Sequence, residues 1–260
     1  MSTASEFALI TGASSGIGVD FARELAGRGY SLILSARRIE RLAQVKIEIE
    51  KEHPVTVHCL PADLGSSAGV RGLYDEIERS GWDVSVLVNN AGLGHFGDFF
   101  DTDYEKVRET LEVNLRAPTE MAWLMGRKMR QARRGFILNV SSYSAFQPPT
   151  DLAVYAATKS YLYSLSQAIN VGLRSHNVSA TALCPGFFQS EFFDKSGLQP
   201  SRLTRAFMLS SRQVARAGIK GMFKRRPNVV PGLAYKFSLL MTRFLPRSMA
   251  TSTANYVIRN

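Results

Sequence analysis

The chain has 260 residues, 45% of them hydrophobic, and a formal net charge of +10 at pH 7. This length and composition suit one folded domain; no apolar run reaches the ~18 residues of a membrane-spanning helix, and the N-terminal segment lacks the features of a secretory signal. Cys59 and Cys184 are expected to be free thiols in a reducing, cytoplasmic compartment, and the four histidines lack the spacing of metal ligands, so no metal site is expected.

The positive charge is concentrated in the last quarter of the sequence. Residues 195–260 contain 13 Lys and Arg and no acidic residue, whereas residues 1–194 contain 19 Lys and Arg and 22 Asp and Glu. A basic segment of this kind is compatible with an anionic partner. Nucleic acid is not expected as that partner, because no recognition motif accompanies the charge.

Short apolar runs alternate with helical periods along the chain. Strands are expected at residues 7–10, 31–35, 55–60, 84–89, 135–141, 178–184 and 228–230. Helices are expected near residues 17–26, 38–52, 67–80, 102–132, 152–175 and 211–224. Continuously apolar strands that alternate with helices are typical of βαβ units. The sequence therefore predicts the α/β class: a doubly wound parallel sheet of about seven strands with helices on both faces, as one domain spanning residues 1–260.

The segment between the first strand and the first helix reads TGASSGIG, from Thr11 to Gly18. Glycine is favoured where the backbone takes a positive φ or approaches a ligand closely. The N-terminus of the helix that follows presents unpaired N–H groups to a phosphate. The alternative is an ordinary loop rich in glycine and serine, but the strand before it and the helix after it favour a phosphate-binding turn.

The second strand ends in LSARR, where a dinucleotide-binding protein that prefers NAD usually has an acid for the ribose 2′-hydroxyl. Here Ala36 is followed by Arg37 and Arg38, and a guanidinium can bind a 2′-phosphate through charge-assisted hydrogen bonds. We therefore predict NADP(H) as the cofactor, with Arg37 as the main contact. The alternative is a solvated arginine pair at the start of a helix.

The segment VYAATKSYLYSL, residues 154–165, contains three tyrosines and one lysine. Tyr155 and Lys159 are spaced i, i+4, so on a helix both project from one face. Tyr161 and Tyr163 point elsewhere and are expected to make packing or subunit contacts. A nearby ammonium stabilises a phenolate, so Tyr155 is a candidate proton donor with a lowered pKa. The alternative is an aromatic side chain that packs on the sheet.

Taken in order, these motifs resemble those of the classical short-chain dehydrogenases/reductases over roughly residues 5–232. The resemblance rests on TGASSGIG, ADL at 62–64, NNAG at 89–92, Asn114 in EVNL, Ser142 in NVSS, YAATK at 155–159 and PGFFQS at 185–190. It implies a single-domain Rossmann fold and an oxidoreductase that interconverts a carbonyl and a secondary alcohol with NADP(H).

The resemblance also implies roles for individual residues. The catalytic residues that it implies are Asn114, Ser142, Tyr155 and Lys159. The cofactor-binding residues that it implies are Gly12, Ser14, Ser15, Gly16, Ile17, Gly18, Arg37, Arg38, Asp63, Leu64, Asn90, Ala91, Gly92, Asn114, Tyr155, Lys159, Pro185, Gly186 and Ser190. Asp63 would contact the adenine, the turn at residues 89–92 would line the adenosine ribose, and Pro185 and Gly186 would lie beside the nicotinamide.

In the reductive direction each catalytic residue has an expected task. Tyr155 would donate a proton to the carbonyl oxygen as general acid, and Ser142 would hydrogen-bond the same oxygen. Lys159 would also hold the nicotinamide ribose hydroxyls, and Asn114 would help to position a water in a proton relay. The cofactor would supply the hydride.

The region at residues 187–215 is expected to form a substrate loop or lid. Phe187, Phe188, Phe192 and Phe193 indicate either an apolar pocket wall or side chains that pack on the core. We expect a hydrophobic carbonyl substrate: a fatty-acyl compound of the 3-oxoacyl type, a steroid-like ketone or an aromatic ketone.

The basic C-terminal extension, residues 233–260, begins with an amphipathic helical pattern. Its apolar face carries Leu233, Phe237, Leu240, Met241 and Phe244. One interpretation is a helix that contacts an anionic membrane surface, or an acyl chain with an anionic head group. The other is a helix that packs on the domain or on a partner subunit.

Three classes of function remain in view. The leading one is an NADP(H)-dependent ketoreductase or alcohol dehydrogenase in the cytoplasm, with membrane association as an option. By the family resemblance it would be a homodimer or homotetramer joined through the helices at 102–132 and 152–175. The alternatives are a catalytically idle NADP(H)-binding sensor or scaffold and a peripheral membrane protein. The complete catalytic set favours the first, because binding alone does not need Tyr155.

Overall fold

The computed structural model describes residues 6–189 and 208–242. The strands are β1 (Phe7–Thr11), β2 (Ser31–Ala36), β3 (Val57–Pro61), β4 (Val84–Asn89), β5 (Gly135–Val140), β6 (Val178–Leu183) and β7 (Asn228–Val229). The helices are α1 (Ile17–Ala26), α2 (Ile39–Glu52), α3 (Ser67–Arg79), α4 (Tyr104–Leu111), α5 (Ala117–Ala132), α6 (Ala153–Leu173), α9 (Ser211–Phe223) and α10 (Leu233–Thr242).

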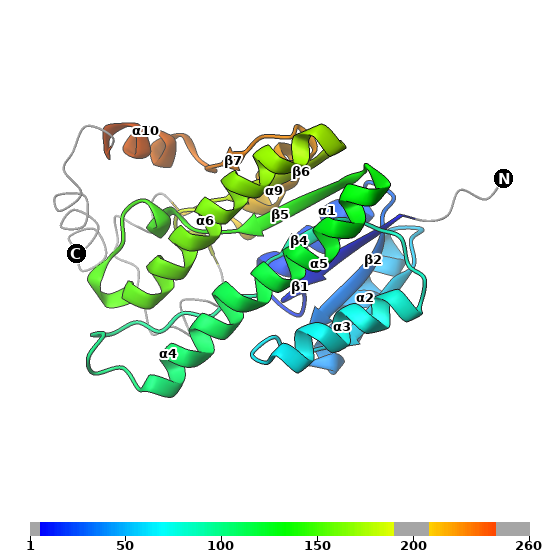
Figure 1. Ribbon diagram of the computed structural model, residues 1–260, viewed down its shortest axis with the longest axis horizontal. Coiled ribbons are helices and arrows are strands. Elements are labelled where there is room, and N and C mark those ends of the chain that lie inside the picture. The colour runs from blue at the N-terminus through cyan, green and yellow to red at the C-terminus, as the bar shows by residue number, and fades with distance from the viewer. Residues whose placement is uncertain (1–5, 190–207, 243–260) are drawn as a thin grey trace.

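The strands form one parallel sheet in the order β3-β2-β1-β4-β5-β6-β7. Helices α4, α5 and α6 cross in front of this sheet in Figure 1, while α1 and α9 lie behind it. The predicted doubly wound sheet of about seven strands is therefore confirmed. The strand order reverses between β1 and β4, and open sheets of this kind bind ligands beyond the carboxyl ends of the strands at such a point.

Two apolar cores lie on the two faces of the sheet. Successive side chains of a strand point to opposite faces. In β1, Ile10 belongs to the core that includes Phe21 of α1, whereas Leu9 belongs to the core that includes Met121 of α5. All four side chains are fully or almost fully buried. The continuous apolar run of β1 follows directly, because neither face of the strand meets water.

The helix predicted at residues 102–132 is divided into three parts. α4 ends at Leu111, residues Glu112–Arg116 form a π-helical turn, and α5 begins at Ala117. A π turn holds more residues than an α turn and often occurs at functional sites. The expectation of one uninterrupted helix is wrong, because hydrophobic periodicity does not register one wider turn. The turn contains the fully buried Asn114.

Helix α10 packs on the domain with one side only. Tyr235 and Leu239 contact a small apolar cluster at the end of β6, whereas Leu233 and Phe237 are 82% and 64% exposed. Packing on the domain is thus observed, but it leaves part of the apolar face uncovered. Phe244 lies outside the described residues. Within the described ranges, every helix is too short or too polar to cross a bilayer.

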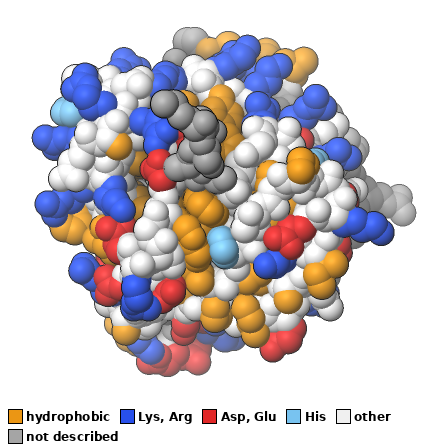
Figure 2. Space-filling view, turned by 90° about the vertical axis from the view of Figure 1, so that its right-hand side faces the viewer, with side chains coloured by type: hydrophobic (Ala, Val, Ile, Leu, Met, Phe, Trp, Pro, Cys, Tyr) orange, Lys and Arg blue, Asp and Glu red, His pale blue; other side chains and the backbone are white. Residues whose placement is uncertain are grey.

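The face at the amino-terminal ends of the strands carries charges of both signs. In Figure 2, which views this face, Lys and Arg side chains are interspersed with Asp and Glu. Arg134 forms ion pairs there with Glu6 and Asp83. A mixed surface of this kind does not create the single-sign field that attracts a polyanion.

Candidate active site

The predicted site residues follow the carboxyl ends of several strands. The glycine turn follows β1, Arg37 follows β2, Asn90 follows β4, Ser142 lies just beyond β5 and Pro185 lies just beyond β6. Because all these strands are parallel and adjacent, the segments meet at one edge of the sheet. Ser190 lies outside the described residues.

The glycine turn has the backbone that a phosphate cradle needs. Gly12 and Gly16 have positive φ values of 65° and 57°. A Cβ on Gly12 would lie 2.8 Å from the Cα of Ala91, and one on Gly18 would lie 2.3 Å from the carbonyl oxygen of Gly12. Gly16, the N-cap of α1, has no side chain to cap the first N–H groups of the helix, and a Cβ built on it would face open space. The first turn of α1 thus fits the diphosphate of a dinucleotide.

Asn90 and Thr11 hold this turn in place. The hydroxyl of Thr11 accepts hydrogen bonds from the N–H groups of Asn90 (3.0 Å) and Ala91 (3.1 Å). The amide of Asn90 donates to the carbonyls of Thr11 (2.8 Å) and Gly12 (3.1 Å). The side chain of Asn90 therefore braces the turn from within.

Asn89, predicted to belong to the turn that lines the adenosine ribose, is buried in the sheet instead. Its amide donates to the carbonyl of Pro118 (3.2 Å) and to Oδ1 of Asn139 (2.8 Å). Asn139 in turn donates to the hydroxyl of Ser166 at 2.9 Å. This chain of buried polar groups joins β4, β5 and α6 beneath the site, and each link satisfies a group that would otherwise be unpaired.

Beyond β3, the side chain of Asp63 belongs to a turn, whereas that of Leu64 points into the core. Oδ1 of Asp63 accepts a hydrogen bond from the N–H of Gly65 at 3.0 Å, which shapes the turn at this corner. The side chain of Leu64 is buried in the core, and its carbonyl accepts from Arg116 at 3.2 Å. Leu64 can therefore approach a cofactor only through its main chain.

The two arginines after β2 have different partners. Nη1 of Arg37 lies 3.3 Å from Oε1 of Glu109 on α4, and these side chains are 61% and 41% exposed. Nη2 of Arg38 lies 3.4 Å from the hydroxyl of Ser14 in the glycine turn. The structure thus places Arg38 directly against the turn, while Arg37 extends across to α4.

Ser142, Tyr155 and Lys159 come together where β5 meets α6. A hydrogen bond joins the side chains of Ser142 and Tyr155. Nζ of Lys159 lies 5.5 Å from the centroid of the Tyr155 ring and donates to the carbonyl of Val140 at 2.8 Å. The shared helical face predicted for Tyr155 and Lys159 is therefore observed, and the strand end holds the lysine.

Asn114 lies between the loop after β4 and helix α6 and hydrogen-bonds residues of both. Its side chain accepts from the N–H of Leu93 (2.8 Å) and donates to the carbonyl of Leu93 (2.7 Å) and to Thr158 (3.2 Å). A Cβ on Gly92 would lie 3.2 Å from Nζ of Lys159 and 3.4 Å from Oδ1 of Asn114, so both polar groups adjoin Gly92. The π turn thus brings Asn114 to the lysine and fixes the loop after β4.

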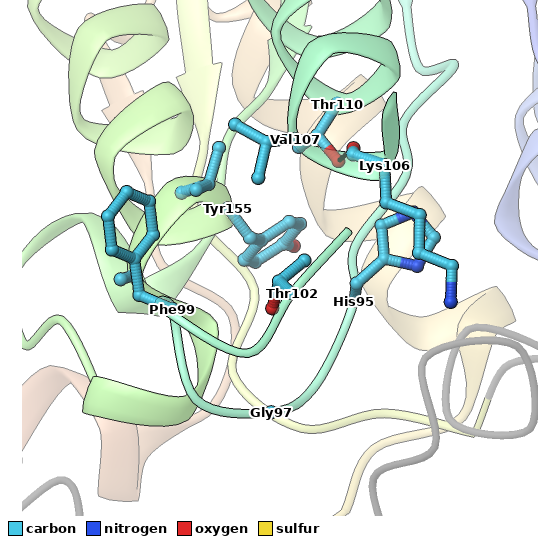
Figure 3. Close-up of a pocket in the computed structure, with 10 residues that line it drawn as sticks. His95, Gly97, Phe99, Thr102, Lys106, Val107, Thr110 and Tyr155 are labelled. Carbon is cyan, nitrogen blue, oxygen red and sulfur yellow. Dashed lines mark hydrogen bonds between the residues drawn. The ribbon is translucent and has the colours of Figure 1, made fainter. Parts of the chain in front are cut away.

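A cleft opens beside Tyr155, between the loop after β4, α4 and the start of α6 (Figure 3). It is open to solvent, has an empty volume of about 300 Å³ when this open space is included, and is lined by His95, Gly97, Phe99, Thr102, Lys106, Val107, Thr110, Ala153, Val154 and Tyr155. The ring of Tyr155 points into it, with Phe99 on one side and His95 and Lys106 on the other. Sequence reasoning placed the substrate region at 187–215 and missed this loop. The available signal was a histidine and several phenylalanines directly after NNAG.

Comparison with known proteins agrees with this geometry. The profile of the short chain dehydrogenases matches residues 6–200. The chain belongs to the short-chain dehydrogenase family. The human very-long-chain 3-oxoacyl-CoA reductase is 31% identical over 189 residues, which are 70% of this chain and 59% of that protein. The chain spans about three fifths of the length of the first curated relatives it matches.

Two solved structures share most of this fold. One from Sphingobium yanoikuyae, in complex with NADPH, has a TM-score of 0.83 and 29% identity, covering 92% of this chain and 93% of its own. The bulky-bulky ketone specific alcohol dehydrogenase from Comamonas testosteroni has a TM-score of 0.79 and 26% identity, covering 93% of both chains. Both cover more of this short-chain dehydrogenase than the curated relatives do.

Burial controls the protonation of the two central residues of this short-chain dehydrogenase. It raises the pKa of Tyr155 to about 12, and the hydrogen bond with Ser142 lowers it by less. Burial also lowers the pKa of Lys159 to about 8, with nearby Cys184 acting in the opposite direction. The expectation that Lys159 lowers the pKa of Tyr155 is wrong for this structure, because desolvation of the phenolate dominates. A phenol that stays protonated is the form a proton donor requires.

Helix α10 holds the turn after β6, which sequence reasoning did not foresee. The hydroxyl of Tyr235 accepts a hydrogen bond from the N–H of Phe187 at 3.0 Å, and its ring lies where a Cβ on Gly186 would be. The carbonyl of Pro185 accepts from the N–H of Tyr143 at 2.8 Å. The expected nicotinamide turn is thus tied both to α10 and to the segment that follows Ser142.

The aromatic residues of the predicted substrate loop are only partly described. Phe188 packs against the core that includes α1 and α9, which agrees with the core-packing alternative for this residue. Phe192 and Phe193 lie outside the described residues. Tyr161 is exposed on α6 and hydrogen-bonded to Thr119, as expected for a residue outside the catalytic group.

Proposed function

We propose that this chain is an NADP(H)-dependent reductase of a hydrophobic ketone or a 3-oxoacyl-type compound. The observation that carries the proposal is the meeting of Ser142, Tyr155 and Lys159 beside a cleft whose walls include Phe99 and Val107. The names of the relatives, which include 3-oxoacyl-CoA reductases and a ketone-specific alcohol dehydrogenase, support the substrate class.

The residues around the glycine turn suit NADP(H). The N–H groups at the start of α1 and the positive φ of Gly12 and Gly16 fit the diphosphate, and Arg37 and Arg38 supply the positive charge for a 2′-phosphate. The NADPH complex of the Sphingobium protein supports this choice. When bound, the cofactor supplies the hydride to the carbonyl carbon.

The protein then has to supply a proton and to stabilise charge on the carbonyl oxygen. Tyr155, protonated at neutral pH, donates its proton to that oxygen as general acid, while Ser142 hydrogen-bonds the same oxygen. Lys159 lies beside the phenolate left behind, with its Nζ atom 5.5 Å from the centroid of the Tyr155 ring. Because the pKa of Tyr155 is about 12 and that of Lys159 about 8, return of a proton from the lysine side to the phenolate is favourable.

The test of the proposal replaces Tyr155 with Phe and Tyr161 with Phe in separate variants. General acid catalysis contributes roughly 10²–10⁴-fold, so Tyr155→Phe should lower kcat by at least about 100-fold across a panel of ketones and 3-oxo esters. NADPH binding, followed by its fluorescence, should change little. Tyr161→Phe is the matched control and should keep full activity, because Tyr161 is exposed and its hydroxyl contacts Thr119, away from the catalytic group. Substantial turnover by Tyr155→Phe would refute the mechanism.

We also propose that the chain forms a homodimer or homotetramer through α5 and α6. Trp123 on α5 and Val171 on α6 are 58% and 68% exposed, and Tyr161 lies between the two helices against Thr119. Exposed apolar side chains on two adjacent long helices suit a subunit contact. For its location, we propose that the protein is cytoplasmic and contacts anionic membranes peripherally through α10. The exposed Leu233 and Phe237 on this helix support the membrane contact.

A further inference from the structure

His95 has a ring nitrogen that is buried but unpaired. Within the described part of the chain, its Nε2 atom is shielded from solvent and has no hydrogen-bond partner. Nearly all buried polar atoms in folded proteins are paired, so an exception calls for an explanation. His95 lines the cleft into which Tyr155 points (Figure 3). A partner brought by the substrate is the explanation that its position offers.

The loop that carries His95 is anchored on both sides. Two residues before it, the main chain of Leu93 exchanges two hydrogen bonds with Asn114, at 2.8 and 2.7 Å. Two residues after it, the N–H of Gly97 donates to the carbonyl of Asp151 at 2.9 Å, just before the helix that carries Tyr155. The main chain on both sides of His95 is therefore held in a defined place relative to the catalytic group, as the support of a binding residue should be.

The walls of the cleft differ in polarity. Phe99, Val107 and Val154 provide apolar surface, whereas His95 and Lys106 lie together on the side opposite Phe99. The oxygen that is reduced already has donors in Ser142 and Tyr155. His95 lines the cleft from a different segment of the chain than these two donors, and its Nε2 atom has no partner among the described residues.

We infer that His95 is a specificity-determining residue that hydrogen-bonds a second carbonyl oxygen of the substrate, as found in 3-oxoacyl esters and thioesters. This inference rests on the proposed reductase function and narrows its substrate class. A simple ketone leaves Nε2 unpaired, whereas a 3-oxo ester satisfies it. A site built to hydrogen-bond a substrate group discriminates against analogues that lack the group, because its own polar atom then stays buried without a partner.

The experiment compares a 3-oxo ester with a simple ketone of the same chain length. His95→Leu removes the ring nitrogen, His95→Gln keeps an amide donor, and His176→Leu is the matched control at the far end of α6. We expect His95→Leu to lower kcat/KM for the 3-oxo ester about 10- to 100-fold, mainly through KM, and to change the value for the ketone less than about threefold. His95→Gln should retain part of the preference, and the control should retain all of it.

A binding measurement without turnover completes the test. In the Tyr155→Phe background, His95→Leu should weaken calorimetric binding of the 3-oxo ester and leave binding of the ketone unchanged. Equal losses for both compounds, or no loss for either, would overturn the assignment of His95 while leaving the reductase function intact. A wild-type protein that reduces neither compound would overturn the proposed function, and the role of His95 with it.

Discussion

Replacing Arg37 with Asp should weaken the binding of NADPH far more than that of NADH. Arg37 lies 3.3 Å from Glu109, and both side chains are largely exposed, at 61% and 41%. An ion pair of this kind contributes only about 0–1 kcal/mol, whereas a hydrogen bond to a charged group contributes about 1.5–3 kcal/mol. Arg37 can therefore exchange Glu109 for a 2′-phosphate with a net gain of about 1–2 kcal/mol. The substitution removes this gain and adds repulsion, so the Kd of NADPH should rise at least about 10-fold.

Glu109→Gln is the matched variant, because it removes only the competitor for Arg37. It should lower the Kd of NADPH by up to about fivefold at low salt and by less at high salt, where exposed charges are screened. Fluorescence titration of NADPH and NADH onto wild type, both single variants and the double variant measures these effects. Arg38, which contacts Ser14 in the glycine turn, is the rival candidate. Unchanged NADPH affinity in Arg37→Asp together with a large loss in Arg38→Ala would refute the assignment to Arg37.

Three further outcomes are expected. The kcat/KM for reduction should fall above about pH 8, because Lys159 loses its charge near its pKa of about 8 while Tyr155 stays protonated up to a pKa of about 12. Lys159→Arg should move this alkaline decline of kcat/KM to higher pH. A decline that stays near pH 8 in the variant would exclude Lys159 as its cause. Trp123→Glu should shift the protein toward monomers in analytical ultracentrifugation, since it puts a charge into the apolar surface of α5; a wild-type monomer would contradict the subunit proposal. Phe237→Asp should reduce co-sedimentation with anionic vesicles at low salt, and a wild-type chain that does not bind them would leave only the packing role of α10.

The sheet was predictable because its central strands, β2, β1, β4, β5 and β6, are buried on both faces. The run FALI at the start of β1 has no polar residue, the polar residues of β4 and β6 are buried as well, and the residues expected for β4 and α1 agree with the observed bounds. Other boundaries were less accurate: β3 begins at Val57 rather than at residue 55, since the β-branched residues begin before the point where pairing with β2 starts. The interruption of the helix around Asn114 was invisible, because side-chain patterning carries no record of a wider backbone turn.

The site was predictable where a motif is local and was missed where it depends on tertiary contacts. The glycine turn and the Tyr155–Lys159 pair are each contained within a few residues, so the sequence predicted their local geometry: a turn between β1 and α1, and two side chains on one face of α6. His95, the bracing role of Asn90 and the contact of Tyr235 with the turn after β6 depend on segments tens of residues apart. A single sequence does not indicate which of its distant segments come into contact.

Spacing also could not predict the protonation of the pair that it identified. An i, i+4 separation brings Lys159 near Tyr155, and on that basis alone the ammonium should stabilise the phenolate. The fold buries both groups, which raises the pKa of one and lowers that of the other. It also directs Nζ of Lys159 to the carbonyl of Val140. The lysine, rather than the tyrosine, is therefore the group whose charge changes closest to neutral pH. In the proposed reductase mechanism, Tyr155 would recover its proton after each turnover from the side of Lys159, which adjoins Asn114 and Gly92.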